Sequence, residues 1–288
     1  MSAAKSKQIQ IVTDSTSDID PKVASDLGIH VVPLYVHFGE ESYKDSIDIS
    51  ADEFYEKLVA GTISPKTSQP TPEDFADLYR NLASKGPVLS MHVSSLLSGT
   101  MNSVNLAKEM VLKEMPDAQI AVVDTYLASL GLANAVMETK KFVSDNPSLE
   151  EAAEFATSIS SRTRIVVSVD TLEYLVRGGR IGKARGLVGG LLQIKPILHL
   201  IDGEIHPYEQ ARTTKKARRR LISIVTEQKD HIVGAAVATT TELELANEIG
   251  ETLSNELNVE EVPIFRIGPV VGTHGGPGTV GVAFVLDS

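Results

Sequence analysis

Hydrophobic residues in the first half of the chain gather in short runs, separated by longer helix-like segments. Four runs of strand length stand at Gln8 to Thr13, His30 to Phe38, Pro87 to Val93 and Gln119 to Asp124. Strands that alternate with helices are typical of βαβ units. The pattern therefore predicts a mostly parallel sheet in this half.

Several of the predicted helices carry recognisable starts. Ser50 and Ser148 each stand three residues before a glutamate, which is a capping-box pattern. Thr71 followed by Pro72 predicts another start, because threonine caps a helix and proline fits its first turn. A further helix is expected from about Gly99 to Met115, directly after a predicted strand.

The second half has a different pattern. Ile165 to Val169 is strand-like, and two more apolar runs, Pro196 to Ile201 and Glu204 to Tyr208, flank Asp202-Gly203. Asp-Gly between two such runs is a strong signal for a two-residue hairpin, so a mixed sheet is expected here. Further along, the pattern predicts a helix from Thr213, a strand over Ile232 to Ala238, a helix over Glu242 to Glu256 and two final strands around a glycine-rich loop.

These patterns predict an α/β protein with two domains. The N-terminal α/β/α domain is expected over residues 8–160, with a mostly parallel sheet. The C-terminal α/β domain is expected over residues 161–288, with a mixed sheet. The boundary is placed within residues 145–163.

Composition narrows the classes of function. The chain has 288 residues, of which 42% are hydrophobic, and a formal net charge of −11, which disfavours non-specific binding to nucleic acid. It has no cysteine, so disulfides and thiol catalysis are excluded. No apolar run approaches the ~18 residues needed to cross a bilayer, and the first residues lack the apolar stretch of a signal peptide. A cytoplasmic protein is expected.

Three polar segments follow or precede predicted elements in the first half. Thr13 to Asp18 follows the first strand, where Asp14 and Asp18 either bind a metal, act as acid and base, or only cap a turn. Thr67 and Ser68 stand in a proline-stiffened loop and either contact a ligand or only lead into the next helix.

The third segment, Ser94 to Thr100, joins a strand to a long helix. The helix amino end offers free N–H groups and partial positive charge, which suit an anion. Ser94, Ser95 and Ser98 add hydroxyls, and Gly99 allows close approach. The segment predicts a carboxylate site; a plain capped turn and a nucleophilic serine remain alternatives, although no G-x-S-x-G motif is present.

Basic residues gather at two places. Arg177 and Arg180 flank two glycines and either pair with an anion or lie in a solvated loop. Helical spacing places a second group on one face, which favours docking to an acidic partner or transient contact with a membrane surface; a solvated face is the alternative. This second group comprises Arg212, Lys215, Lys216, Arg219 and Arg220.

Near the C-terminus, Gly272 to Thr279 is glycine-rich and contains Thr273 and His274. Such a loop is typical of close backbone approach to a ligand, and His274 is its one titratable group. No pair of histidines has the spacing of metal ligands, so no metal is expected.

Five of these segments, in order, resemble motifs of the DegV family of bacterial fatty acid-binding proteins. They are Val12 to Thr16 (VTDST), Lys66 to Pro70 (KTSQP), Ser94 to Thr100 (SSxLSGT), Arg177 to Arg180 (RGGR) and Gly272 to Gly278 (GTHxGPG), which span nearly the whole chain, residues 9–287. The resemblance implies a two-domain DegV-like fold with a long-chain fatty acid in the cleft. It also implies that Thr67, with Ser98 or Ser95, holds the carboxylate, that His274 lies nearby, and that an ATP-dependent fatty acid kinase is the partner.

The expected function is non-covalent binding of one long-chain fatty acid, with no catalytic residue and no other cofactor. A serine-dependent hydrolase and a phosphotransferase like dihydroxyacetone kinase are the alternatives. The expected ligand-binding residues are Thr67, Ser68, Ser94, Ser95, Ser98, Gly99, Thr273 and His274. The expected partner-docking residues are Arg177, Arg180, Arg212, Lys215 and Arg219.

Overall fold

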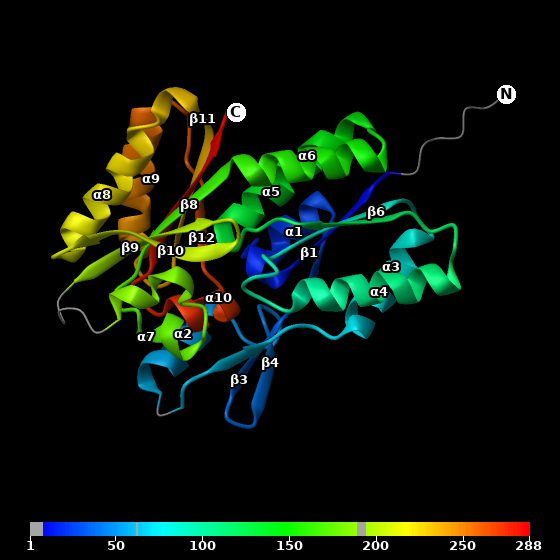
Figure 1. The fold of residues 1–288 in the computed structure, drawn as a ribbon, viewed down its shortest axis with the longest axis horizontal. Coiled ribbons are helices and arrows are strands. Elements are labelled where there is room, and N and C mark those ends of the chain that lie inside the picture. The colour runs from blue at the N-terminus through cyan, green and yellow to red at the C-terminus, as the bar shows by residue number, and fades with distance from the viewer. Residues whose placement is uncertain (1–7, 62, 189–193) are drawn as a thin grey trace.

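The computed structural model describes residues 8–61, 63–188 and 194–288. It confirms an α/β fold with one parallel and one mixed sheet. Figure 1 shows these sheets side by side, with helices between them and on both outer sides. Among the helices of the described residues, none is both long and apolar enough to cross a bilayer.

The first sheet has four parallel strands in the order β2-β1-β6-β7. Its strands are β1 (Gln10–Asp14), β2 (Ile29–Val32), β6 (Val88–His92) and β7 (Ile120–Asp124). Helices α3 (Pro72–Ala83) and α4 (Thr100–Glu114) cover one face, and α5 (Ser129–Phe142) and α6 (Leu149–Arg162) cover the other. Helix α1 (Pro21–Leu27) joins β1 to β2.

The second sheet has six strands in the order β10-β9-β8-β13-β11-β12, and every pair but β11–β12 is antiparallel. Its strands are β8 (Thr163–Ser168), β9 (Lys195–Ile201), β10 (Glu204–Ala211), β11 (Ile232–Thr239), β12 (Ile264–Arg266) and β13 (Val280–Leu286). Helices α8 (Thr214–Thr226) and α9 (Leu243–Leu257) cover its outer face, while α5 packs on its inner face.

A third, small sheet lies beside these two. It pairs β3 (Tyr35–Phe38) with β4 (Glu41–Lys44) and β5 (Lys66–Ser68), next to α2 (Ala51–Ala60) and α10 (Pro269–Gly275). The single strand expected over His30 to Phe38 is wrong, because the run divides between β2 and β3. Pro33 lies in the break, where a missing N–H and a fixed φ interrupt a strand.

Local signals predicted several elements correctly. Ser50 and Ser148 form the expected capping boxes with their glutamates, and Thr71 caps α3. The β9–β10 hairpin turns at Asp202 and Gly203, whose φ values of 48° and 80° are both positive, as a type I′ turn requires.

Two expectations about helices are corrected. Arg212 precedes α8, which begins at Thr214, so it does not share the helix face with the other basic residues. The glycine-rich segment from Gly272 to Thr279 is not wholly a loop. Its first half continues α10, whose first turn contains Pro269.

The core is continuous between the two large sheets. One cluster joins Ile11 of β1 and Leu132 of α5 to Ala283 of β13, and a second fills the space between the six-stranded sheet and its outer helices. Helix α6 ends at Arg162 and β8 begins at Thr163. The proposed domain division near residue 160 therefore separates two sheets that share one core.

Candidate functional site

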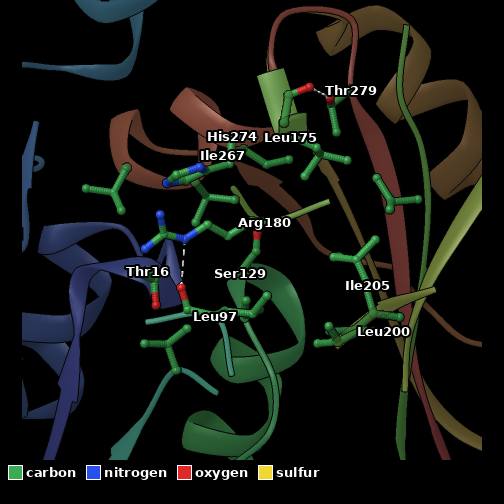
Figure 2. Close-up of a pocket in the computed structure, with 18 of the residues that line it drawn as sticks. Thr16, Leu97, Ser129, Leu175, Arg180, Leu200, Ile205, Ile267, His274 and Thr279 are labelled. Atoms are coloured by element: carbon green, nitrogen blue, oxygen red, sulfur yellow. Dashed lines mark hydrogen bonds between the residues drawn. The ribbon is translucent and has the colours of Figure 1, made fainter. Parts of the chain in front are cut away.

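An apolar cavity lies between the inner face of the six-stranded sheet and the first half of the chain. It holds about 1020 Å³ of space free of protein atoms, including its opening to solvent. Figure 2 shows Arg180, His274 and Thr16 on one side and Leu200 and Ile205 on the other. Most of the wall is apolar, including Leu97, Ile165, Val167, Leu198, Leu200 and Ile205.

Thr67 and His274 meet at the polar end. Thr67 Oγ1 lies 2.9 Å from His274 Nε2. Strand β5 holds Thr67 by pairing with β3, in the register Val36 to Thr67, and α10 supplies His274. Two segments separated by more than two hundred residues in sequence therefore place a hydroxyl and an imidazole on one wall.

The histidine ring is neutral at physiological pH. Desolvation by burial, and then the nearby charge of Arg180, lower the pKa of His274 to about 4. Its Nδ1 is buried, has no hydrogen-bond partner and lies against Gly178, where an added Cβ would overlap the ring. We assign the ring proton to Nε2, because an N–H at Nδ1 would be an unpaired buried donor. The hydroxyl proton of Thr67 is then free for a ligand.

Arg180 brings a positive charge into the cavity lining. Its Nε donates to the carbonyl of Leu97 at 2.9 Å, and its Nη1 donates to the carbonyl of Gly178 at 2.6 Å. These bonds fix the guanidinium, and among the hydrogen bonds of the described residues none uses its Nη2. Because the Arg-Gly-Gly-Arg turn folds back over Leu97, a residue expected to dock a partner stands beside Thr67 and His274 instead of on open surface.

Ser98 also reaches the cavity, at the start of α4. Its Oγ lies 2.9 Å from Thr100 Oγ1 and accepts a 3.3 Å hydrogen bond from the Thr100 N–H. The serine side chain is therefore bonded to the first residue of α4 and also lines the cavity. Of the ligand-binding residues expected from the sequence, the cavity lining brings together Thr67, Ser98 and His274.

The other expected ligand-binding residues lie outside that lining. The Ser94 hydroxyl is buried and donates to the Gly203 carbonyl, which ties the β9–β10 turn to the first half. The remaining four are also outside the lining. Ser95 is exposed, and the Ser68 hydroxyl contacts His37. Gly99 packs against Gln69, and the Thr273 hydroxyl donates to the Pro269 carbonyl.

Three hydroxyls in the lining were missed from the sequence, and one of them, Thr279 Oγ1, donates to the Gly275 carbonyl at 2.8 Å. Thr16 Oγ1 donates to Asp14 at 2.5 Å, and Ser129 Oγ donates to Asp18 at 2.5 Å. Because their protons are engaged, both hydroxyls offer only lone pairs to the cavity, which suits neighbouring methylenes better than a carboxylate. Thr16 stands in the Thr13 to Asp18 segment, but Ser129 had no motif to mark it.

Asp14 belongs to a sealed network behind Thr16. Its Oδ2 lies 2.9 Å from His92 Nδ1, and His92 Nε2 lies 2.6 Å from Ser90 Oγ. Tyr79 donates in turn to Ser90 at 2.6 Å. The order serine, histidine, aspartate matches that of a hydrolase triad, but Ser90 and His92 are fully buried, so a substrate has no path to the hydroxyl.

A pair of carboxyls lies near the same segment. Burial raises the pKa of Asp18 well above its usual range and raises the pKa of Asp45 to about 7. Asp18 accepts from the Gly268 N–H at 2.9 Å and so joins α10 to the first half. Within the described ranges, no cluster of three or more acidic or histidine side chains has a geometry that suits a metal.

The expected docking residues fall on two different faces. Arg177 is exposed near the cavity, where it pairs with Glu173 and donates to Ser64. Lys215 and Arg219 are exposed on α8, on the outer face of the six-stranded sheet and across it from the cavity. Arg220, from the same predicted stripe, pairs with Glu209 and Glu227, which neutralises part of it.

Comparisons with known proteins agree over almost the full chain. A family model described as an uncharacterised protein of the DegV family matches residues 8–287. A DegV domain-containing protein of Halalkalibacterium halodurans is 37% identical over 284 residues, covering 97% of this chain and 99% of that protein.

Two solved structures are also similar. One, a DegV family protein from Thermus thermophilus described by its fatty acid binding, is 36% identical with a TM-score of 0.89 and covers 97% of this chain and 99% of its own. The other, a stearic acid-binding protein from Eubacterium ventriosum, is 30% identical with a TM-score of 0.90 and covers 97% and 98%.

Proposed function

Because the chain belongs to the DegV family, as its five motifs indicated, we propose that it binds one long-chain fatty acid non-covalently in the cavity and acts as a carrier. The proposal is supported by one observation above all. A single cavity has Arg180 and His274 at one end, where Thr67 bonds to His274, and apolar side chains line the path away from them. Solved relatives described as fatty acid-binding proteins have the same fold.

The head group is held at the polar end. The Thr67 hydroxyl and the Arg180 guanidinium donate to the carboxylate, and Ser98 lies at the same wall. A hydrogen bond to a charged group contributes roughly 1.5–3 kcal/mol. Among the described residues of the lining, Arg180 is the one side chain that carries positive charge at neutral pH, so it balances the carboxylate.

The acyl chain supplies the larger part of the affinity. Each buried methylene contributes about 0.8 kcal/mol, so the apolar wall outweighs the head-group contacts for a long chain. Association and chain ordering offset part of this gain. The cavity therefore favours long-chain acids over short ones that share the same carboxylate.

The test compares isosteric changes inside and just outside the cavity. Thr67→Val removes the hydroxyl that faces the ligand, whereas Ser68→Ala removes the neighbouring hydroxyl, which contacts His37 instead. We expect native mass spectrometry to show one co-purified fatty acid, and Thr67→Val to weaken binding of delipidated protein about tenfold or more. Equal affinities for Thr67→Val and Ser68→Ala, or no bound acid in any preparation, would contradict the proposal.

The bound carboxylate is presented to an ATP-dependent fatty acid kinase. Arg177 supports this step, because it is exposed on the turn that carries Arg180 and lies beside the cavity. Lys215 and Arg219 on α8 are separated from the cavity by the six-stranded sheet, and Arg212 directly follows β10, so we assign the contact at the head group to Arg177. Arg177→Ala is expected to slow phosphorylation of the bound acid by a partner kinase at low salt while leaving fatty acid affinity unchanged; equal phosphorylation rates would contradict this role.

A further inference from the structure

The end of the cavity away from the head group is closed by a row of apolar side chains. Ile165 on β8 lies directly opposite Leu200 on β9, and Leu200 lies opposite Ile205 on β10. Residues opposite each other share one face of a sheet, so the three side chains form a continuous wall. In Figure 2, Leu200 and Ile205 lie across the cavity from Arg180 and His274.

A second hollow, the rear groove, begins on the other side of this wall. Its lining includes Leu127, Thr157 and Ile201, and it holds about 1600 Å³ of space free of protein atoms, open solvent included. Tyr126 and Tyr208, which also line it, are 49% and 38% exposed, so the rear groove reaches the surface. Ile165 and Leu200 line both the cavity and the rear groove.

The Ile165 side chain packs against a glycine of α5, Gly131. An added Cβ at Gly131 would overlap the end of the Ile165 side chain and would also contact Leu127. The absence of a side chain at Gly131 therefore provides the space that Ile165 fills. The isoleucine belongs to the buried apolar cluster that includes Leu130 and Leu132 of α5.

We propose that Ile165 and Leu200 form a gate that sets the longest acyl chain the cavity encloses, and that the ends of longer chains enter the rear groove when the gate opens. The inference rests on the proposed function. Val169, which directly follows β8 and also lines the cavity, is four residues from Ile165, roughly 13 Å at the usual rise of a strand. An extended long-chain acyl group is longer than this, so its end meets Ile165 and Leu200.

The test measures affinity for saturated acids of increasing length, from dodecanoate to tetracosanoate, by displacement of a fluorescent fatty acid from delipidated protein. Ile165→Ala and Leu200→Ala open the wall. Leu198→Ala is the matched control, because it removes a similar volume from the cavity but does not line the rear groove. Each further methylene removed from water raises affinity by roughly fourfold. We expect this gain to continue to longer acids in the two gate variants, while Leu198→Ala keeps the wild-type limit.

A gentler variant leaves both gate residues in place. Gly131→Ala adds a methyl group in the space that the Ile165 side chain occupies. Because alanine is a better helix former than glycine, α5 is retained. We expect Gly131→Ala to change the chain-length limit. The same limit in this variant as in wild type would overturn the gate, and so would an equal extension in Leu198→Ala and the gate variants. If wild-type protein binds no acid of any length, the proposed function itself fails, which the same series shows separately.

Discussion

Two groups of side chains in this protein combine a hydroxyl, a histidine and a charged group, but only one of them faces the cavity. In the sealed network, Ser90, His92 and Asp14 are fully buried and bonded to one another. In the cavity group, Thr67 bonds to His274, whose Nδ1 has no partner, and Arg180 stands beside them.

The difference shows that residue types alone do not mark a functional site. The sealed network satisfies its polar atoms internally and stabilises the fold around β1 and β6. In the cavity group, Thr67 and Arg180 each keep a hydrogen-bond donor that no atom of the described residues accepts. Such donors next to the apolar wall of the cavity favour a carboxylate. The two groups should therefore respond differently to substitution.

The largest effect is expected from His92→Ala. This change removes one hydrogen bond from the buried Asp14 carboxyl, which keeps its bonds from Thr16 and Val93, and leaves a cavity where the buried ring stood. It should cost about 3–5 kcal/mol of the free energy of unfolding. His274→Ala, the matched control on the cavity wall, should cost about 1 kcal/mol or less. Urea unfolding of delipidated protein measures both. Similar losses in the two variants would show that the networks do not differ as described.

The next largest effect is expected from a substitution of Asp45, because this buried carboxyl lacks part of its hydrogen bonding. One of its oxygens has no hydrogen-bond partner among the described residues. Burial raises its pKa to about 7, although hydrogen bonds from the Ser15 and Ser46 hydroxyls and the Val270 N–H lower it. The nearby Asp14 charge raises the pKa further.

Because the unfolded chain ionises at pH 3.8 and the folded protein holds the proton to about pH 7, the stability that Asp45 contributes is lost as pH rises through that range. Asp45→Asn should remove this slope and raise stability at pH 8, relative to pH 4, by about 3–4 kcal/mol compared with wild type. Unfolding midpoints at both pH values check this. Parallel pH profiles for the two proteins would contradict the expectation.

A smaller effect, on ligand binding, is expected at Gly178, which packs against the His274 ring. Gly178→Ala should push the ring away from its position beside Thr67, since an added Cβ overlaps it. We expect roughly tenfold weaker fatty acid binding, equivalent to about 1.4 kcal/mol, with little change in stability. Gly186→Ala is the control, because an added Cβ there meets nothing within 4 Å. Equal affinities would show that the ring position does not matter.

The smallest expected effect is the acid sensitivity that His274 adds. Its folded pKa of about 4 lies below the usual 6.5, so the unfolded chain binds the extra proton and stability falls as pH drops from 6.5 towards 4. His274→Gln should reduce this loss by about 1 kcal/mol, since the ring is only partly covered. Unfolding in urea at pH 7 and pH 4.5 measures the difference, and an unchanged loss would contradict it.

Short-range signals explain which parts of the fold the sequence predicted well. The capping boxes at Ser50 and Ser148 and the Asp202-Gly203 turn depend on residues within a few positions of one another. Strand β5 was expected as a loop, because its pairing of Thr67 with Val36 is set by a distant strand. The division at Pro33 and the start of α10 at Pro269 have local causes that were overlooked, because proline has a fixed φ and no N–H.

The candidate site shows the same limit. Thr67, Ser98 and His274 stood in motifs, and the structure gathers them at one cavity. The sequence predicts Arg180 as a docking residue or as a partner of an anion. Its place in the cavity lining depends on its contact with the Leu97 carbonyl, which joins segments far apart in sequence. Ser129 and the wall residues Ile165 and Leu200 carried no local signal, since apolar residues that line a cavity look like ordinary core.

The central claim is that one fatty acid lies in this cavity with its carboxylate at Thr67 and Arg180. A crystal structure of the protein with bound palmitate tests it most directly. We predict carboxylate oxygens within hydrogen-bond distance of Thr67 Oγ1 and the Arg180 guanidinium, with the chain running past Val167 and Leu198 towards Leu200. Density for the acid elsewhere, or a reversed chain with its carboxylate at Leu200, would contradict the account.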